Sequence, residues 1–239
     1  MNVRKSDTVG SIVTNNILSA SVFNNYGIDF YSLGNRTLQE ACIDQRVPIV
    51  NVVEELWDIP VPPKRVPDFG NMNLIKLLTY ILRTHHKFAE RKLVFIRHTL
   101  ERLVSDFGKK HSDLSDVKKT FGDMSVYLTV HMKHEEFIVF PIIFEMVRDH
   151  NSGFPLFQEI DQPLASIKED HDHEVLALRK LADLTDNYTV PKGGDYSFRV
   201  AYNAMKELEE DLKIHIHLEN NILLPKAIDY AYNRIESLN

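Results

Sequence analysis

The chain has 239 residues, of which 44% are hydrophobic and 26% charged, and its net charge is −6 at pH 7. It contains no uncharged apolar run of about 18 residues and no signal-peptide core, so we expect a cytoplasmic protein without a membrane span. The negative charge argues against nucleic acid as a partner, and the single cysteine, Cys42, excludes an internal disulfide and a cysteine-rich zinc site. Few glycines and long stretches between turn signals favour helices over strands.

The first 58 residues predict a small helical domain. Thr37-Leu-Gln-Glu40 has the pattern of a capping box, and the apolar residues between Val52 and Trp57 indicate a further helix. A proline-rich segment over 59–70 follows and predicts an extended linker, because proline is incompatible with a helix interior. A domain of about 60 residues is marginally stable by itself, so we expect it to lean on a partner surface, and a homodimer is one such arrangement.

Residues 71–239 predict an all-α, up-down four-helix bundle. Four segments repeat apolar residues every three or four positions, over 75–107, 117–142, 160–182 and 198–222, as amphipathic helices do. Turn signals lie between them, and these are Gly108, Gly153 with Pro155, and Pro191 with Gly193 and Gly194. Four such helices with turns between them can bury their apolar faces against one another.

One motif occurs twice in the bundle. His131 and Glu135 precede Pro141, and His215 and Glu219 precede Pro225, each in the pattern His-x₃-Glu-x₅-Pro. Residues four apart lie on the same face of a helix, about 6 Å apart along its axis. The two other apolar stripes are interrupted by a single histidine at a similar level, and the full set of inward polar residues is therefore His86, His131, Glu135, His171, His215 and Glu219.

These six residues predict a dinuclear metal centre. A buried ionised carboxylate is unfavourable by several kcal/mol unless a cation compensates it, and imidazole with carboxylate is a common ligand set. His86 precedes His131 by 45 residues and His171 precedes His215 by 44, so each half of the bundle offers one equivalent half-site. We expect the two glutamates to bridge the ions. The alternative is a metal-free helical interaction protein whose inward histidines and glutamates form a hydrogen-bonded network.

A mixed His/Glu set in a bundle favours iron or manganese over zinc, and the spacing alone does not choose between the two. His86 is preferred to its neighbour His85, whose apolar stripe leaves the core sooner. Tyr127 and Asp211 precede proposed ligands by one turn and suit either outer-sphere hydrogen bonds or the helix surface. The remaining histidines near the motifs are expected at the rim or in solvent, and these are His134, His173 and His217.

Four segments resemble the hemerythrin-like di-iron bundle: Thr84-His-His-Lys87, His131-x₃-Glu-Glu136, Glu169-Asp-His-Asp172 and His215-x-x-Leu-Glu-Asn-Asn-x-Leu-x-Pro225. The whole chain resembles the bacterial "repair of iron centres" family, whose small N-terminal domain is similar to Tyr26-Gly-Ile-Asp-Phe-Tyr-Ser-Leu-Gly-Asn-Arg-Thr-Leu38. That family usually carries adjacent cysteines just after the Tyr/Phe position, where this chain has Tyr31 and Ser32. The side chains that thiol chemistry in that domain would require are therefore replaced here.

The resemblance implies an oxo- and carboxylate-bridged di-iron centre, with iron preferred to manganese and with the same six residues as ligands. It implies a role in repairing iron–sulfur clusters damaged by oxidative or nitrosative stress, through iron donation or NO handling. Its partners would be damaged iron–sulfur proteins and small molecules such as NO or O₂. The alternative is a hemerythrin-like carrier or sensor of O₂ or NO. A di-iron activity that reduces NO or reacts with O₂ stays open, and a hydrolase is not expected.

Overall fold

The computed structural model describes residues 3–63, 66–148 and 156–238. Within these ranges the regular elements are helices, and the one bridge between extended residues joins Thr8 to Thr37. The all-α prediction is therefore confirmed. Contacts along the chain divide it into two compact units, Met1–Thr79 together with Lys213–Asn239, and Tyr80–Leu212. Over the described ranges no helix combines the length and apolarity that a membrane crossing requires.

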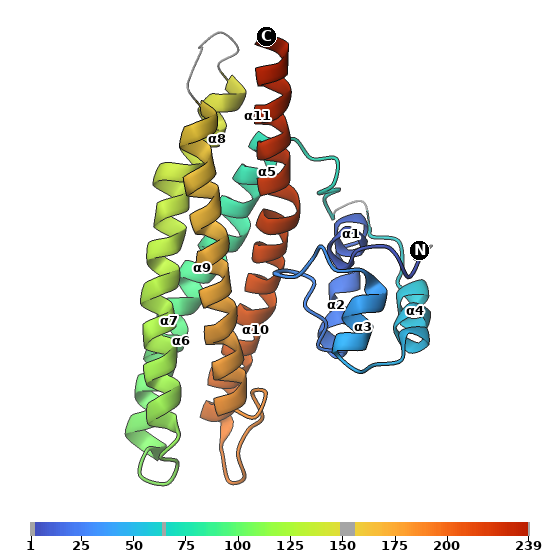
Figure 1. The fold of residues 1–239 in the computed structure, drawn as a ribbon. Helices are drawn as coiled ribbons and strands as arrows, with labels where there is room; N and C mark the ends of the chain where they lie inside the picture. The colour runs from blue at the N-terminus through green and yellow to red at the C-terminus, as the bar shows by residue number, and fades with distance from the viewer. Residues whose placement is uncertain (1–2, 64–65, 149–155, 239) are drawn as a thin grey trace. The chain divides into compact units, whose positions relative to one another are not determined.

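The first unit begins with four short helices (Figure 1): α1 (Val9–Asn15), α2 (Ser19–Asn25), α3 (Leu38–Asp44) and α4 (Ile49–Asp58). The capping box of α3 is confirmed, because the Thr37 hydroxyl accepts from the Glu40 amide and the Glu40 carboxylate accepts from the Thr37 amide. Their apolar faces, together with Ile28 and Phe30 of the loop between α2 and α3, bury the side chains of Val9, Ile12, Val13, Phe23, Leu38, Val52 and Leu56. Residues 59–63 of the predicted linker form no helix, and Lys64 and Arg65 lie outside the described residues.

The loop between α2 and α3 packs against the C-terminal part of the same unit, η3 (Glu219–Leu223) and α11 (Leu224–Leu238). One carboxylate oxygen of Asp29 accepts from the amides of Tyr31, Ser32 and Leu33 and so orders the loop. Nδ2 of Asn221 on η3 donates to the carbonyl oxygens of Phe30 and Tyr31, at 3.3 and 3.1 Å. The loop is thus fixed to the helical segment that begins at Glu219.

The second unit is a bundle in which α6 (Lys87–Phe107), α7 (Leu114–His134), α9 (Leu156–Leu184) and α10 (Tyr196–Leu218), as far as Leu212, run side by side (Figure 1). Gly108 is the C-cap of α6, as predicted. The turn predicted at Gly153 and Pro155 lies outside the described residues, as does the side chain of Ile160. The core contains Leu93, Ile96, Leu100, Leu103, Val117, Phe121, Leu128, Leu178, Leu181, Phe198, Met205, Leu208 and Leu212.

Three π-helical segments interrupt the long helices. η1 (Leu82–His86) lies between α5 (Leu74–Ile81) and α6, η2 (Glu135–Val139) lies between α7 and α8 (Phe140–Arg148), and η3 lies between α10 and α11. A π turn uses one residue more than an α turn. Each segment begins or ends at a predicted ligand, His86, Glu135 or Glu219.

The π turns shift the buried face by one residue relative to the predicted apolar stripe. After Glu135 the sequence pattern places Ile138 inside, but Ile138 is 47% exposed and Val139 is buried. Pro141 and Pro225 stand two residues after η2 and η3. In a regular α-helix a proline ring opposes the carbonyl four residues before it, and the wider π turn accommodates this. The repeated proline in the motif therefore marks the register shift.

The packing of the loop on η3 predicts that Gly34→Ala destabilises the protein. A Cβ at Gly34 would lie 2.1 Å from Oδ1 of Asn221, so the Asn221 side chain would have to leave its hydrogen bonds to Phe30 and Tyr31 or the loop would have to move. Overpacking of this kind lowers the free energy of unfolding by about 1–3 kcal/mol. Gly122→Ala is the matched control, because a Cβ there meets no atom within 4 Å inside α7 and should stabilise by about 0.5–1 kcal/mol. Chemical denaturation measures both, and equal effects of the two would refute the tight contact.

Candidate metal centre

The carboxylate of Glu135 lies between two histidines in the second unit. Its Oε2 is 3.3 Å from Nε2 of His86, and its Oε1 is 3.5 Å from Nε2 of His131. His131 is near the end of α7, Glu135 opens η2 one turn later, and His86 ends η1. All three side chains are buried. Each oxygen of one carboxylate therefore faces a different imidazole, which is the geometry that a bridging carboxylate needs.

His171 on α9 joins this cluster. Its ring centroid lies 5.0 Å from that of His131, and one ligand atom each of His131, Glu135 and His171 lie within 4.8 Å of one another. His171 is fully buried. The second unit thus brings together four of the six residues that the sequence singles out.

The other two predicted residues are in the first unit and contact each other. Nε2 of His215, near the end of α10, is 3.0 Å from Oε1 of Glu219, the first residue of η3. Both side chains are fully buried. The two halves of the repeated motif therefore show the same local arrangement, a buried imidazole with a carboxylate one turn later. The assignment of all six side chains to one dinuclear centre stays a prediction.

Outer carboxylates fix the protonation of two histidines. Nδ1 of His86 is 3.0 Å from Oε1 of Glu136, and Nδ1 of His131 is 3.1 Å from Oδ2 of Asp170. Since an ionised carboxylate only accepts hydrogen bonds, Nδ1 carries the proton in each ring, and in the neutral imidazole Nε2 keeps its lone pair. Both Nε2 atoms face Glu135. Lone pairs and carboxylate oxygens that converge in a buried place fit a bound cation, and Glu136 and Asp170 would orient the two rings towards it.

These outer carboxylates are themselves held by further side chains. Nζ of Lys133 donates to Glu136 at 2.6 Å and to Glu90 at 2.7 Å, and the hydroxyl of Tyr127 donates to Asp170. Burial opposes ionisation of Glu136, but hydrogen bonds from Lys133 and His86 outweigh it and lower the pKa of Glu136. The pKa of Asp170 is likewise lowered, because hydrogen bonds from Tyr127 and His131 outweigh its burial. Both outer groups therefore stay ionised acceptors at neutral pH.

Three acidic residues at this site were given no role from the sequence. Glu136 and Asp170 are neighbours of predicted ligands, but their partners lie 50 and 39 residues away along the chain. Glu174, 1% exposed on α9, has its Oε1 3.8 Å from Nε2 of His131. The available signal for Glu174 was its i+3 spacing from His171.

The other histidines divide into buried and exposed groups. The expectation that His217 lies at the rim is wrong, because it is fully buried between the loop and η3, with Nδ1 3.2 Å from Nδ2 of Asn221. Burial lowers its pKa to about 4, so it is neutral at pH 7. His85 is also buried, and its Nδ1 is 3.1 Å from Oδ1 of Asp211. His173 is exposed and His134 is partly buried.

No thiol lies where the sequence comparison with the repair family would place one. The hydroxyl of Ser32 donates to Oδ2 of Asp29 at 2.5 Å, and the ring of Tyr31 lies 5.9 Å from Nζ of Lys213. Cys42 is buried in α3, and burial raises the pKa of its thiol, which keeps it protonated. The unit therefore offers no reactive thiolate.

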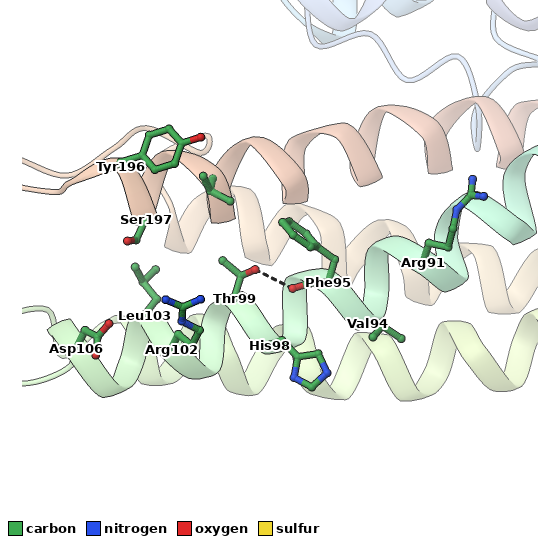
Figure 2. Close-up of a pocket in the computed structure, with 11 residues that line it drawn as sticks. Arg91, Val94, Phe95, His98, Thr99, Arg102, Leu103, Asp106, Tyr196 and Ser197 are labelled. Carbon is green, nitrogen blue, oxygen red and sulfur yellow. Dashed lines mark hydrogen bonds between the residues drawn. The ribbon is translucent and has the colours of Figure 1, made fainter.

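A groove of about 570 Å³ lies between α6 and the start of α10, and Figure 2 shows its lining residues on the two helices. Its polar side chains include Arg91, His98 and Arg102, which are exposed, and its apolar wall includes Val94 and Phe95. Two guanidinium groups repel a cation. We therefore assign metal binding to the buried His/Glu cluster and not to this groove.

Comparison with protein families gives two matches. Residues 77–227 match the hemerythrin HHE cation-binding domain. Residues 5–59 match the ScdA_N domain, which is described as a domain of unknown function. The first match covers more than half of the chain and contains all six predicted ligands.

Two similar proteins align over nearly their whole length. The iron–sulfur cluster repair protein ScdA of Staphylococcus haemolyticus is 25% identical over 233 residues, which cover 94% of this chain and 99% of that protein. The iron–sulfur cluster repair protein YtfE of Yersinia pseudotuberculosis is 25% identical over 224 residues, which cover 94% of this chain and 97% of that protein.

The network beside His86 predicts that Glu90 supports stability only when it is ionised. Hydrogen bonds from Lys133 and Lys87 lower the pKa of Glu90 from 4.5 to about 2. Because the pKa is depressed on folding, this contribution is complete above pH 4.5 and is lost as the pH falls towards 2. We expect Glu90→Gln to lower the urea midpoint at pH 6.5 by more than it does at pH 3. The exposed control Glu54→Gln should change little, and an effect of Glu90→Gln that does not vary with pH would contradict this account.

Proposed function

This chain belongs to the hemerythrin HHE cation-binding family, and from that premise we propose that it is a di-iron protein that repairs damaged iron–sulfur clusters. The resemblance seen in the sequence is thereby confirmed at the level of the family. One observation carries the metal part of the proposal: the buried Glu135 carboxylate directs one oxygen to His86 and the other to His131.

In the proposed centre, His86 and His215 would hold one ion, His131 and His171 would hold the other, and Glu135 and Glu219 would be shared by the two. Two irons are proposed in preference to manganese because the family is that of hemerythrin. An iron pair with open coordination positions would supply electrons to O₂ or NO and a place for either molecule to bind. The chain's own groups supply neutral imidazoles, held in one tautomer by Glu136 and Asp170.

The repair role is supported by two relatives that are named for it and that align over 94% of this chain. We propose damaged iron–sulfur proteins as clients, reached through iron donation or NO handling, in the cytoplasm. We further propose a small N-terminal domain over 1–58, a linker over 59–70 and the iron-binding bundle over 71–239. The separate family matches over 5–59 and 77–227 support this division.

A second candidate, a carrier or sensor of O₂ or NO, is favoured by the N-terminal loop. Tyr31 and Ser32 offer no thiol, and Cys42 is buried, so a mechanism that passes iron or electrons through sulfur has no residue in this unit. A carrier needs only the iron pair and its open positions.

The metal assignment predicts two irons per chain and a loss of at least one of them in Glu135→Ala or Glu219→Ala. Removal of a bridging carboxylate takes away a ligand from both ions at once. Elemental analysis after chelator challenge measures the content, with the exposed Glu169→Ala as control. Unchanged iron in both bridge variants would contradict the bridging roles.

The repair proposal predicts that the iron-loaded protein restores activity to an iron–sulfur enzyme inactivated by NO. The assay is run without O₂, and Glu135→Ala serves as the metal-deficient control. We expect recovery several-fold above this control. Recovery no greater than the control, together with a stable and reversible O₂ adduct of the reduced protein, would replace repair by the carrier function.

A further inference from the structure

The bundle buries a third carboxylate beside the proposed centre. Glu174 follows His171 by three residues on α9, so the two side chains share one face of the helix. The side chain is 1% exposed, and its Oε1 lies 3.8 Å from Nε2 of His131. The duplicated pattern contains no counterpart of Glu174. His86 holds the position of His171 in the other half of the bundle, and the residue three positions after His86 is Ala89.

Two carboxylates lie near one imidazole nitrogen at this place. Nε2 of His131 lies 3.5 Å from Oε1 of Glu135 and 3.8 Å from Oε1 of Glu174. Asp170 holds the proton of His131 on Nδ1, at 3.1 Å, so in the neutral ring Nε2 presents a lone pair on the side of both glutamates. Three electron-rich groups in a buried site repel one another unless positive charge lies among them.

We propose that Glu174 is an additional ligand of the metal ion held by His131 and His171. This inference rests on the proposed di-iron function and deepens it. A His and a Glu three residues apart on one helix can reach the same ion, as carboxylate and histidine at that spacing do in other helical bundles. Oxygen and nitrogen donors of this kind suit a hard, highly charged ion such as iron or manganese.

The consequence is that the two ions are unequal. The ion beside His131 has one carboxylate more than the ion beside His86. The added negative charge holds it more tightly and favours its higher oxidation state. One ion should therefore resist chelation and reduction more than the other.

The test compares Glu174→Gln with the exposed control Glu169→Gln on the same helix, in the full chain. We expect Glu174→Gln to weaken the binding of one of the two irons at least tenfold in a chelator competition, and to leave the other unchanged. The ⁵⁷Fe Mössbauer spectrum of the unaltered protein should show two distinct iron signals. In Glu174→Gln one of these signals should weaken or disappear, and the other should remain. Glu169→Gln should match the unaltered protein in both measurements.

Thermal unfolding of the metal-free and metal-loaded forms separates ligation from a structural role. Without metal, Glu174→Gln removes a buried charge beside the neutral ring of His131 and should raise the melting temperature, whereas with metal it removes a ligand and should lower it. A purely structural glutamate would give a lower melting temperature in both forms, which would overturn the proposal. If Glu174→Gln does not fold, Glu174→Asp, which keeps the charge but shortens its reach, takes its place with the same expected loss of one iron.

The two proposals fail in different ways. Two tightly bound irons in the unaltered protein, with the same affinities and spectra in Glu174→Gln, would refute the role of Glu174 and leave the di-iron centre intact. Fewer than two irons in the unaltered protein would refute the di-iron function and, with it, the role of Glu174.

Discussion

The charge of Glu135 is the constraint on which the centre of the bundle depends. A carboxylate with no exposed surface is unfavourable by several kcal/mol without a compensating charge. The folded chain brings an imidazole nitrogen to each of its oxygens, at 3.3 and 3.5 Å, and imidazoles are groups that share a cation with a carboxylate.

The groups around this carboxylate form two hydrogen-bonded paths that lead outwards. One runs from His86 through Glu136 and Lys133 to Glu90, and the other runs from His131 through Asp170 to Tyr127. In each path an ionised acceptor stands next to an imidazole and is held there by a donor from farther out. Such paths orient the rings before any ligand arrives, which reduces the conformational freedom lost on binding.

The sequence was sufficient to predict the helical class and the inward-facing residues, because the spacing of two residues along a helix determines whether their side chains lie on the same face. The prediction failed where a π turn changes this spacing and where burial depends on residues distant along the chain. After Glu135 the π turn moves Val139 into the core position expected for Ile138. His217 was misplaced because its burial arises from a loop almost 190 residues away. Glu136 and Asp170 contact partners on other helices, and no local pattern reports such pairs.

The π turns also affect how related sequences should be aligned. Each π turn contains one residue more than an α turn. Deletion of one residue between Glu135 and Pro141 would therefore restore a regular α-helix with nearly all its hydrogen bonds. The part that follows would then rotate by about 100° about the helix axis, and Val139 and Ile143 would leave the core. At 25% identity a one-residue gap is easily placed here by chance. Such a gap would mark the gain or loss of a binding site, and it should not be treated as a neutral length difference.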